Sequence, residues 1–350
     1  MRKSRRHVGG LVEQSAFHRS ARSTSVAESL SELDAGLRSH TAREVRTVPT
    51  EFSVLDDVLG GGLHGGELIM LGGPPGVGKT IMALQWARNM ARAGHRAIYV
   101  CYEHEPITLL TRLLALEAGE SGGDDSSGRS IEQALSLADA TGRGLDDVLA
   151  ETESGTAAIE RLRGYQDNLI FIRASGSSTT MDEVRDLVSP HVEVADSAAL
   201  FIDYLQKIPL HPEPDSEAEK VTRTVEMTKD LALDLHVPAV MLSAIDAEGM
   251  RANRIRLYHL RGSSAIAFES DVVLMLNDKQ RAISKIHLSY DPIGAREFKH
   301  WVVTSVEKNR GGPNLIDLEF RKDFGHFRFD PQGGVVREKL VDERLDEANF

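Results

Sequence analysis

Eight consecutive residues of this chain have the types and spacing that bind phosphate groups. They follow the pattern G-x-x-x-x-G-K-[ST] and read Gly73-Pro74-Pro75-Gly76-Val77-Gly78-Lys79-Thr80. The glycines let backbone N–H groups turn toward phosphate oxygens, and a helix that begins there adds the positive end of its dipole. Lys79 would neutralise the outer phosphates, and the Thr80 hydroxyl would bind Mg²⁺. With an apolar strand before it and a helical pattern after it, this phosphate-binding loop (P-loop) predicts a site for a nucleoside triphosphate.

Two acids at the ends of apolar runs are candidates for the remaining chemistry. Asp203 ends the run that begins at Leu200, and Glu103 follows the run 97–102. Because the C-terminal ends of parallel strands meet at one edge of a sheet, we expect Asp203 beside the P-loop as a second Mg²⁺ ligand. We expect Glu103 to orient and deprotonate the attacking water. Its neighbour Glu105 is the residue most easily confused with it.

Short apolar runs alternate with helical segments from residue 50 onward, and these elements must position the candidate residues. Such runs indicate parallel strands covered on both faces, whereas the closely spaced runs after residue 283 indicate antiparallel strands. We therefore predict an α/β fold with a mostly parallel sheet, helices on both faces and C-terminal antiparallel hairpins. The Gly/Ser/Asp-rich segment 119–130 predicts a surface loop. The expected parallel strands are 68–71, 97–102, 168–172, 199–205, 239–245 and 271–276, and the expected antiparallel runs are 286–290, 299–308, 315–320 and 326–329.

The composition of the 350 residues is that of a chain with a sizeable core. Hydrophobic residues make up 41%, and the net charge is −12, which excludes a disordered or collagen-like chain. The single Cys101 excludes an internal disulfide and a cysteine-cluster zinc site, and the histidines, His104 included, show no metal-ligand spacing. No run is apolar enough to span a membrane and no secretory signal is evident, so we expect a cytoplasmic protein without a membrane partner.

The chain divides into three segments by composition. Residues 1–45 are expected to form a basic, flexible arm with a short amphipathic helix, residues 46–332 the α/β domain, and residues 333–350 an acidic tail. The helix is expected from Val26 to Leu37, where apolar residues recur at helical spacing. Its apolar stripe would pack either on its own domain or on a neighbouring subunit.

A series of motifs in this order resembles the RecA-like motor domain of the DnaB-type hexameric replicative helicases, over roughly residues 47–330. The resemblance implies a RecA-like P-loop NTPase that hydrolyses ATP with Mg²⁺, and it implies that Glu103 is the catalytic glutamate. It also implies that Lys308 and Arg310 reach the ATP of the adjacent subunit, so hydrolysis would require a ring, most simply a hexamer, or a filament. The matching segments are 48–56, 73–80, 97–103, Asp203-Tyr204-Leu205-Gln206, 260–271 and Glu307-Lys308-Asn309-Arg310-Gly311-Gly312-Pro313.

The same resemblance implies a DNA-facing loop in the segment 251–261. This segment holds four arginines and no acid, so it could contact phosphates of single-stranded DNA without reading their sequence. The alternatives are a solvated surface loop and arginines that serve contacts between subunits. The four residues are Arg251, Arg254, Arg256 and Arg261.

Several departures from the family pattern keep other functions open. Ala244 follows Leu242-Ser243 where the family has a γ-phosphate-sensing glutamine, and Glu51 stands where the family usually has glycine. No helical domain of the kind that these helicases use to stabilise hexamers is recognised before residue 46, so we expect a specialised relative. The leading hypothesis is an ATP-dependent DNA helicase or translocase. The alternatives are a RecA/RadA/KaiC-like ATPase in recombination or regulation, and an ATP-gated assembly module. Any loading partner is left open.

Overall fold

The computed structural model describes residues 23–39, 42, 46–122, 127–152, 154–284 and 294–341. Contacts divide the chain into two units, residues 1–42 and 43–350. In the first unit the expected helix is present as α1 (Val26–Ser39). Ser25 and Glu28 exchange side-chain and backbone hydrogen bonds at its start, which is a capping box. The apolar stripe of α1 is exposed along its length, at Val26, Leu30, Leu33 and Leu37.

One mixed sheet forms the centre of the second unit. Its strands lie in the order β11-β10-β9-β8-β3-β7-β6-β4-β5, with β12 paired to β10. All neighbours from β8 to β5 run parallel, which confirms the predicted parallel core. These strands are β3 (Leu68–Gly72), β4 (Arg96–Cys101), β5 (Leu169–Arg173), β6 (Ala198–Asp203), β7 (Ala239–Ser243) and β8 (Val272–Asp278). A separate antiparallel pair, β1 (Thr47–Val48) and β2 (Leu63–His64), precedes them.

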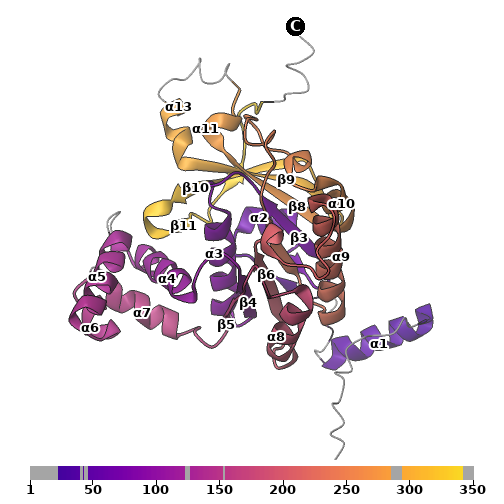
Figure 1. Cartoon of the computed structure of the whole chain (residues 1–350), viewed down its shortest axis with the longest axis horizontal. Helices are drawn as coiled ribbons and strands as arrows, with labels where there is room; N and C mark the ends of the chain where they lie inside the picture. The colour runs from indigo at the N-terminus through magenta and orange to yellow at the C-terminus, as the bar shows by residue number, and fades with distance from the viewer. Residues whose placement is uncertain are drawn as a thin grey trace, which may run out of the picture. The chain divides into compact units, whose positions relative to one another are not determined.

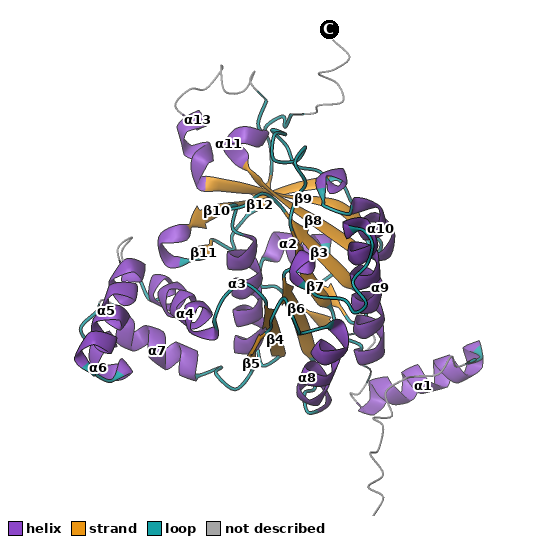
Figure 2. Ribbon diagram, viewed as in Figure 1, coloured by secondary structure: helices purple, strands orange, loops and turns teal. Residues whose placement is uncertain are grey.

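Alternate residues of the parallel strands face two different apolar clusters. In β3, Ile69 and Leu71 join the cluster under α3 and α4, whereas Leu68 and Met70 join the cluster under α8, α9 and α10. Figure 2 shows helices on both sides of the strands. Burial on both faces explains why these strands are apolar runs without polar alternation. Apart from the helices between β4 and β5, the second unit contains α2 (Ser53–Val58), α3 (Lys79–Arg92), α8 (Met181–Glu193), α9 (Glu217–Leu235), α10 (Ser263–Glu269), α11 (Lys279–Ala282) and α13 (Gly294–Glu297). Its 3-10 turns are η2 (Leu205–Lys207), η3 (Leu257–His259), η4 (Phe298–His300) and η5 (Phe324–His326).

Beyond β8 the sheet becomes antiparallel, as predicted. The strands there are β9 (Trp301–Asn309), β10 (Ile316–Asp323), β11 (Arg328–Phe329) and β12 (Gly334–Val335). The fold continues past residue 332, because Val335 pairs with Leu318 and Leu340 pairs with Ile283. The expected run 286–290 and the end of the chain, 342–350, lie outside the described residues.

Four helices between β4 and β5, called the insertion below, lie together at one side of the sheet (Figure 1). They are α4 (Pro106–Glu120), α5 (Ser127–Thr141), α6 (Leu145–Leu149) and α7 (Gly155–Arg163). The loop expected at 119–130 is therefore shorter than predicted, because Ser127 and Gly128 already belong to α5 and are buried. Among the described residues, no helix has the length and apolar character required to cross a membrane.

Candidate functional site

The P-loop connects the buried strand β3 to the start of α3. Gly73, Gly76 and Gly78 have φ angles of 153°, 77° and 105°, which only glycine adopts without strain. Lys79 begins α3, and its Nζ donates hydrogen bonds to the backbone oxygens of Gly73 at 2.7 Å and Pro74 at 3.1 Å. Burial lowers the pKa of Lys79, although Asp203 and Glu103 act in the opposite direction. A bound phosphate would favour the charged form of Lys79, so this lysine is suited to binding an anion.

Asp203, at the end of β6, lies against the first turn of α3. Its carboxylate accepts a hydrogen bond from the Thr80 hydroxyl at 2.9 Å and one from the Tyr99 hydroxyl at 3.1 Å. Burial raises the pKa of Asp203, and these hydrogen bonds offset only part of that effect. Burial and the nearby Asp203 charge raise the pKa of Tyr99, which keeps it a donor. A buried carboxylate beside a hydroxyl is a donor set that suits Mg²⁺.

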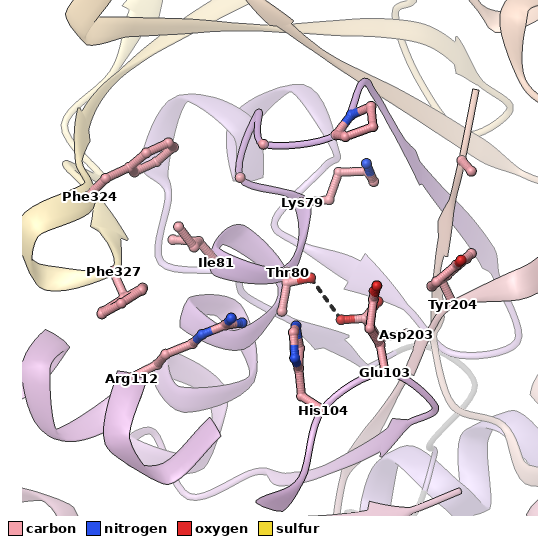
Figure 3. A pocket seen from close by; sticks show the side chains of 14 residues that line it. Lys79, Thr80, Ile81, Glu103, His104, Arg112, Asp203, Tyr204, Phe324 and Phe327 are labelled. Carbon is pink, nitrogen blue, oxygen red and sulfur yellow. Dashed lines mark hydrogen bonds between the residues drawn. The ribbon is translucent and has the colours of Figure 1, made fainter. Parts of the chain in front are cut away.

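A cavity of about 390 Å³ opens in front of these residues. Figure 3 shows Lys79, Thr80 and Asp203 in one part of it and the rings of Phe324 and Phe327 in another. A Cβ atom at Gly76 would meet nothing within 4 Å, so the loop backbone is open to a ligand. The cavity is lined by Pro75, Gly76, Gly78, Lys79, Thr80, Ile81, Glu103, His104, Arg112, Asp203, Tyr204, Ala244, Phe324 and Phe327.

The two neighbouring glutamates have different surroundings. Glu103 follows β4 and lines the cavity near Asp203 (Figure 3). Glu105 accepts a hydrogen bond from Arg173 Nε at 2.6 Å and does not line the cavity. Within the part of the chain that the structure describes, no hydrogen-bond or ion-pair partner of the Glu103 side chain is found. Glu103 is therefore the carboxylate available to a water molecule in this cavity.

The far wall of the cavity consists of residues that the sequence analysis missed. Phe324 and Phe327 come from the turn η5 and the residue after it, and the guanidinium of Arg112 in α4 lies 5.6 Å from the centre of the Phe327 ring. Ile81 of α3 completes this wall (Figure 3). Flat aromatic and guanidinium groups are suited to stacking on a nucleobase. The sequence signal is weak, because the run 326–329 predicts a strand and Arg112 belongs to no motif.

Lys308 and Arg310 meet at the C-terminal end of α10. Lys308 Nζ donates to the backbone oxygens of Ala267 and Ser270, and Arg310 donates to that of Phe268. Arg310 also forms an ion pair with Asp271 at 3.1 Å. Burial and the Arg310 charge lower the pKa of Lys308. The two basic residues therefore lie together, and neither lines the P-loop cavity of its own chain.

The four arginines of the predicted DNA-facing loop divide into two kinds. Arg254 Nη2 binds both carboxylate oxygens of Asp317, at 2.7 and 2.9 Å, and Arg256 forms an ion pair with Glu307 at 2.7 Å. These two stabilise the loop against β9 and β10. Arg251 and Arg261 are exposed. Arg261 forms a 2.6 Å ion pair with Glu217, itself 43% exposed at the side chain.

Gln206 lies against the position where the family has its sensor glutamine. Its Oε1 accepts a hydrogen bond from Ala244 N at 3.1 Å, and its Nε2 donates to Ser243 Oγ at 3.0 Å. Ala244 lines the cavity, whereas Gln206 does not. The end of β7 is therefore attached to the segment after β6 through Gln206.

The parallel sheet, the P-loop between β3 and α3 and the buried acid at the end of β6 define a P-loop NTPase with a RecA-like fold. Solved structures agree on the fold. One solved ATPase domain aligns with a TM-score of 0.68 and 18% identity, covering 88% of this chain and 99% of that chain. A DnaB-like replicative helicase aligns with a TM-score of 0.65 and 20% identity, covering 88% and 67%.

The family model of the DnaB-like helicase C terminal domain matches residues 47–329, and the chain belongs to this family. The replicative DNA helicase DnaB of Treponema pallidum is 27% identical over 285 residues, 80% of this chain and 55% of that protein. DnaB of Leifsonia xyli is 27% identical over 82% of this chain and 57% of that protein. DNA repair protein RadA of Mycolicibacterium smegmatis matches 25% of this chain at 41% identity, and 17% of that protein. The chain thus spans little more than half the length of these DnaB relatives, and the resemblance inferred from the motifs is confirmed.

Proposed function

We propose that this chain is an ATP-dependent DNA helicase or translocase that hydrolyses ATP at the subunit interfaces of a homo-oligomeric ring on single-stranded DNA. One observation carries the proposal: the P-loop, the Thr80–Asp203 pair and Glu103 share one cavity in a chain of the DnaB-like family. These are the groups needed to hold a triphosphate and activate water beside it.

Each group has a separate role in the proposed hydrolysis. Thr80 and Asp203 would hold Mg²⁺, which when bound stabilises negative charge on phosphate oxygens. Lys79 exchanges its two backbone carbonyl contacts for the outer phosphates. Glu103 accepts the proton of the attacking water, because it faces the cavity and is not held by another side chain in the described part of the chain.

We infer that a cation from another subunit completes this cavity. Among the described residues that line it, the lysine and arginine side chains are those of Lys79 and Arg112. Lys308 and Arg310 lie instead at the end of α10. We infer that these two residues serve the ATP site of the adjacent subunit. An arginine supplied in this way accelerates phosphoryl transfer by about 10³- to 10⁵-fold in other NTPases.

A regulatory or recombination ATPase without unwinding activity is the second candidate. Two observations favour it: Ala244 offers no polar side chain to a γ-phosphate, and RadA proteins match part of the chain. In this case ATP turnover would not be coupled to movement along DNA.

The steady-state ATPase rate with and without single-stranded DNA, measured across protein concentrations, separates these candidates. A helicase or translocase should turn over faster with DNA, and its specific activity should rise with protein concentration as subunits assemble. Lys79→Ala should abolish turnover and is the control for contaminating ATPases. A rate that ignores DNA favours the regulatory ATPase, and equal rates for Lys79→Ala and the unmodified chain would contradict the P-loop assignment.

A further inference from the structure

The turn η5 is enclosed by the helices α4 and α5 of the insertion. Gly128 of α5 has its Cα against the carbonyl oxygen of Gly325, so that a Cβ atom there would overlap this oxygen. Gly119 of α4 lies similarly close to His326, because a Cβ atom would come within 2.6 Å of its ring. Two helices with glycine at the contact therefore hold one three-residue turn.

His326 is the buried residue at the centre of this contact. Its Nδ1 lies 2.8 Å from Asp323 Oδ1, and its Nε2 lies 2.8 Å from Ser127 Oγ in α5. An ionised carboxylate only accepts hydrogen bonds, so Nδ1 must carry the proton that faces Asp323. In the neutral ring Nε2 then accepts from the Ser127 hydroxyl. Asp323 is itself held by Arg328 Nε at 2.9 Å.

The same turn forms the aromatic wall of the P-loop cavity. Phe324 and Phe327 lie on either side of His326 in the chain, and both line the cavity, whereas His326 does not. Phe324 also packs on Phe329 edge to face, and a Cβ atom at Gly78 of the P-loop would clash with both rings. A shift of η5 relative to α5 would therefore displace this wall with respect to the P-loop, because the same turn contacts Gly128 of α5 and Gly78 of the P-loop.

We propose that His326 is a positioning residue for the nucleotide base. His326 is hydrogen-bonded between Ser127 and Asp323, and it thereby fixes the turn η5, whose neighbouring rings Phe324 and Phe327 form the base-stacking wall. Through His326, α5 sets the affinity of the cavity for the base without contacting the phosphates. This proposal rests on the proposed function, since it takes the cavity as a nucleotide site. The proposal gives a role to α5. This helix contains none of the P-loop residues, neither of the proposed Mg²⁺ ligands Thr80 and Asp203, and neither of the proposed interface residues Lys308 and Arg310.

The test compares two ligands that differ in the base: MgATP and magnesium tripolyphosphate. Gly128→Ala inserts a methyl group between α5 and η5, and Ser127→Ala removes only the hydroxyl. We expect Ser127→Ala to weaken MgATP binding about three- to tenfold, the effect of one missing hydrogen bond, and Gly128→Ala to weaken it more. Tripolyphosphate binding should stay within about twofold of the unmodified chain, because it interacts with the P-loop alone.

Gln133→Ala is the matched control, since Gln133 is exposed on the same helix and should leave both affinities unchanged. Circular dichroism establishes that each variant is folded, and Ser127→Ala carries the test if Gly128→Ala does not fold. Equal losses for both ligands would assign a general structural role to this packing and overturn the proposal, as would unchanged MgATP binding. An unmodified chain that binds neither ligand would instead contradict the nucleotide function itself.

Discussion

Glu103 and Glu105 show how surroundings assign chemistry at the level of single residues. Both follow β4, but Arg173 holds Glu105 outside the cavity, whereas Glu103 lines it together with Asp203. The Glu105 carboxylate is directed at Arg173 and not at the space in front of the P-loop. The geometry therefore separates two glutamates that the motif alone leaves adjacent.

Glu103→Gln should reduce the ATPase rate by about 100-fold or more while leaving MgATP affinity within a few fold, because an amide cannot accept the water proton. Glu105→Gln has the same change of charge two residues away and should keep most of the activity. Steady-state turnover and equilibrium nucleotide binding of the two variants measure this. Loss of activity in Glu105→Gln with retention in Glu103→Gln would reverse the assignment.

Among the elements, α3 and α4 are held together by a buried group of charges. Arg88 of α3 is fully buried and binds Glu117 at 3.3 Å and Glu120 at 3.2 Å, both in α4. Burial raises the pKa of Glu120, but the hydrogen bond and charge of Arg88, with two further arginines, outweigh it and leave that pKa below its ordinary value. Since α3 begins with Lys79 and α4 supplies Arg112, this cluster joins the helix that follows the P-loop to the helix that carries Arg112.

Glu120→Gln should destabilise the fold by about 2 kcal/mol at neutral pH, because a charged hydrogen bond to buried Arg88 is weakened. The folded-state pKa of Glu120 is depressed, so its contribution is present above the unfolded-state pKa and is lost as the pH falls through the folded-state value. The difference in free energy of unfolding between the two chains should therefore shrink below about pH 4. Denaturant unfolding at several pH values measures it.

Glu151→Gln is the control for this experiment. Glu151 also pairs with an arginine, Arg143 at 2.7 Å, but on the exposed surface. Surface pairs contribute little, so the stability of this variant should follow that of the unmodified chain at every pH. An equal pH-dependent loss in both variants would show that burial of the charge cluster is unimportant.

The elements also show what the sequence could and could not predict. The strands β3, β4, β6, β7 and β8 were predictable because both of their faces are buried. The P-loop and Asp203 were predictable because local motifs specify them. The aromatic wall was not predictable, because Arg112 and Phe327 meet only through the docking of α4 on η5. The prediction of a surface loop over 119–130 was partly wrong. The glycines and serines of this segment favour a loop, but Gly128 belongs to α5 and is needed where this helix contacts Gly325.

At the scale of the whole molecule, the position of Arg310 predicts that activity needs more than one subunit. A chain with Arg310→Ala keeps its own site, and a chain with Glu103→Gln keeps its basic residues at the end of α10. Each should be nearly inactive alone. Mixed in equal amounts, they should regain activity at about a quarter of the interfaces of a closed ring, where an intact site meets an intact arginine.

The ATPase rate of the mixture, measured against the mixing ratio, is the readout. Arg173→Ala serves as the control partner, because Arg173 lies on the surface and pairs with Glu105 outside the cavity. Its mixtures with the unmodified chain should follow a straight line. A mixture of the two inactive chains that gains no activity over either one removes the support for a shared site.

The ion pairs of the 251–261 segment determine which arginines can be tested for DNA binding. Arg254 and Arg256 bind Asp317 and Glu307, so replacing them would disturb the loop itself and confuse binding with folding. Arg251 and Arg261 are exposed and can be replaced with less structural damage. If they bind phosphates, replacing them should weaken binding of single-stranded DNA irrespective of its sequence.

Replacing both Arg251 and Arg261 by alanine should lower the slope of log affinity against log salt by about 0.7 for each phosphate that is no longer neutralised. Equilibrium DNA binding at a series of salt concentrations measures the slope. A double variant at Lys299 and Arg321, two exposed basic residues outside the segment, removes the same charge and should leave the slope unchanged. An equal reduction of the slope in both double variants would show that net charge, and not this loop, governs binding, and an unchanged slope in the Arg251 and Arg261 variant would place the DNA site elsewhere. Because the chain carries a net charge of −12, affinity for DNA requires such a local basic surface, and this comparison locates it.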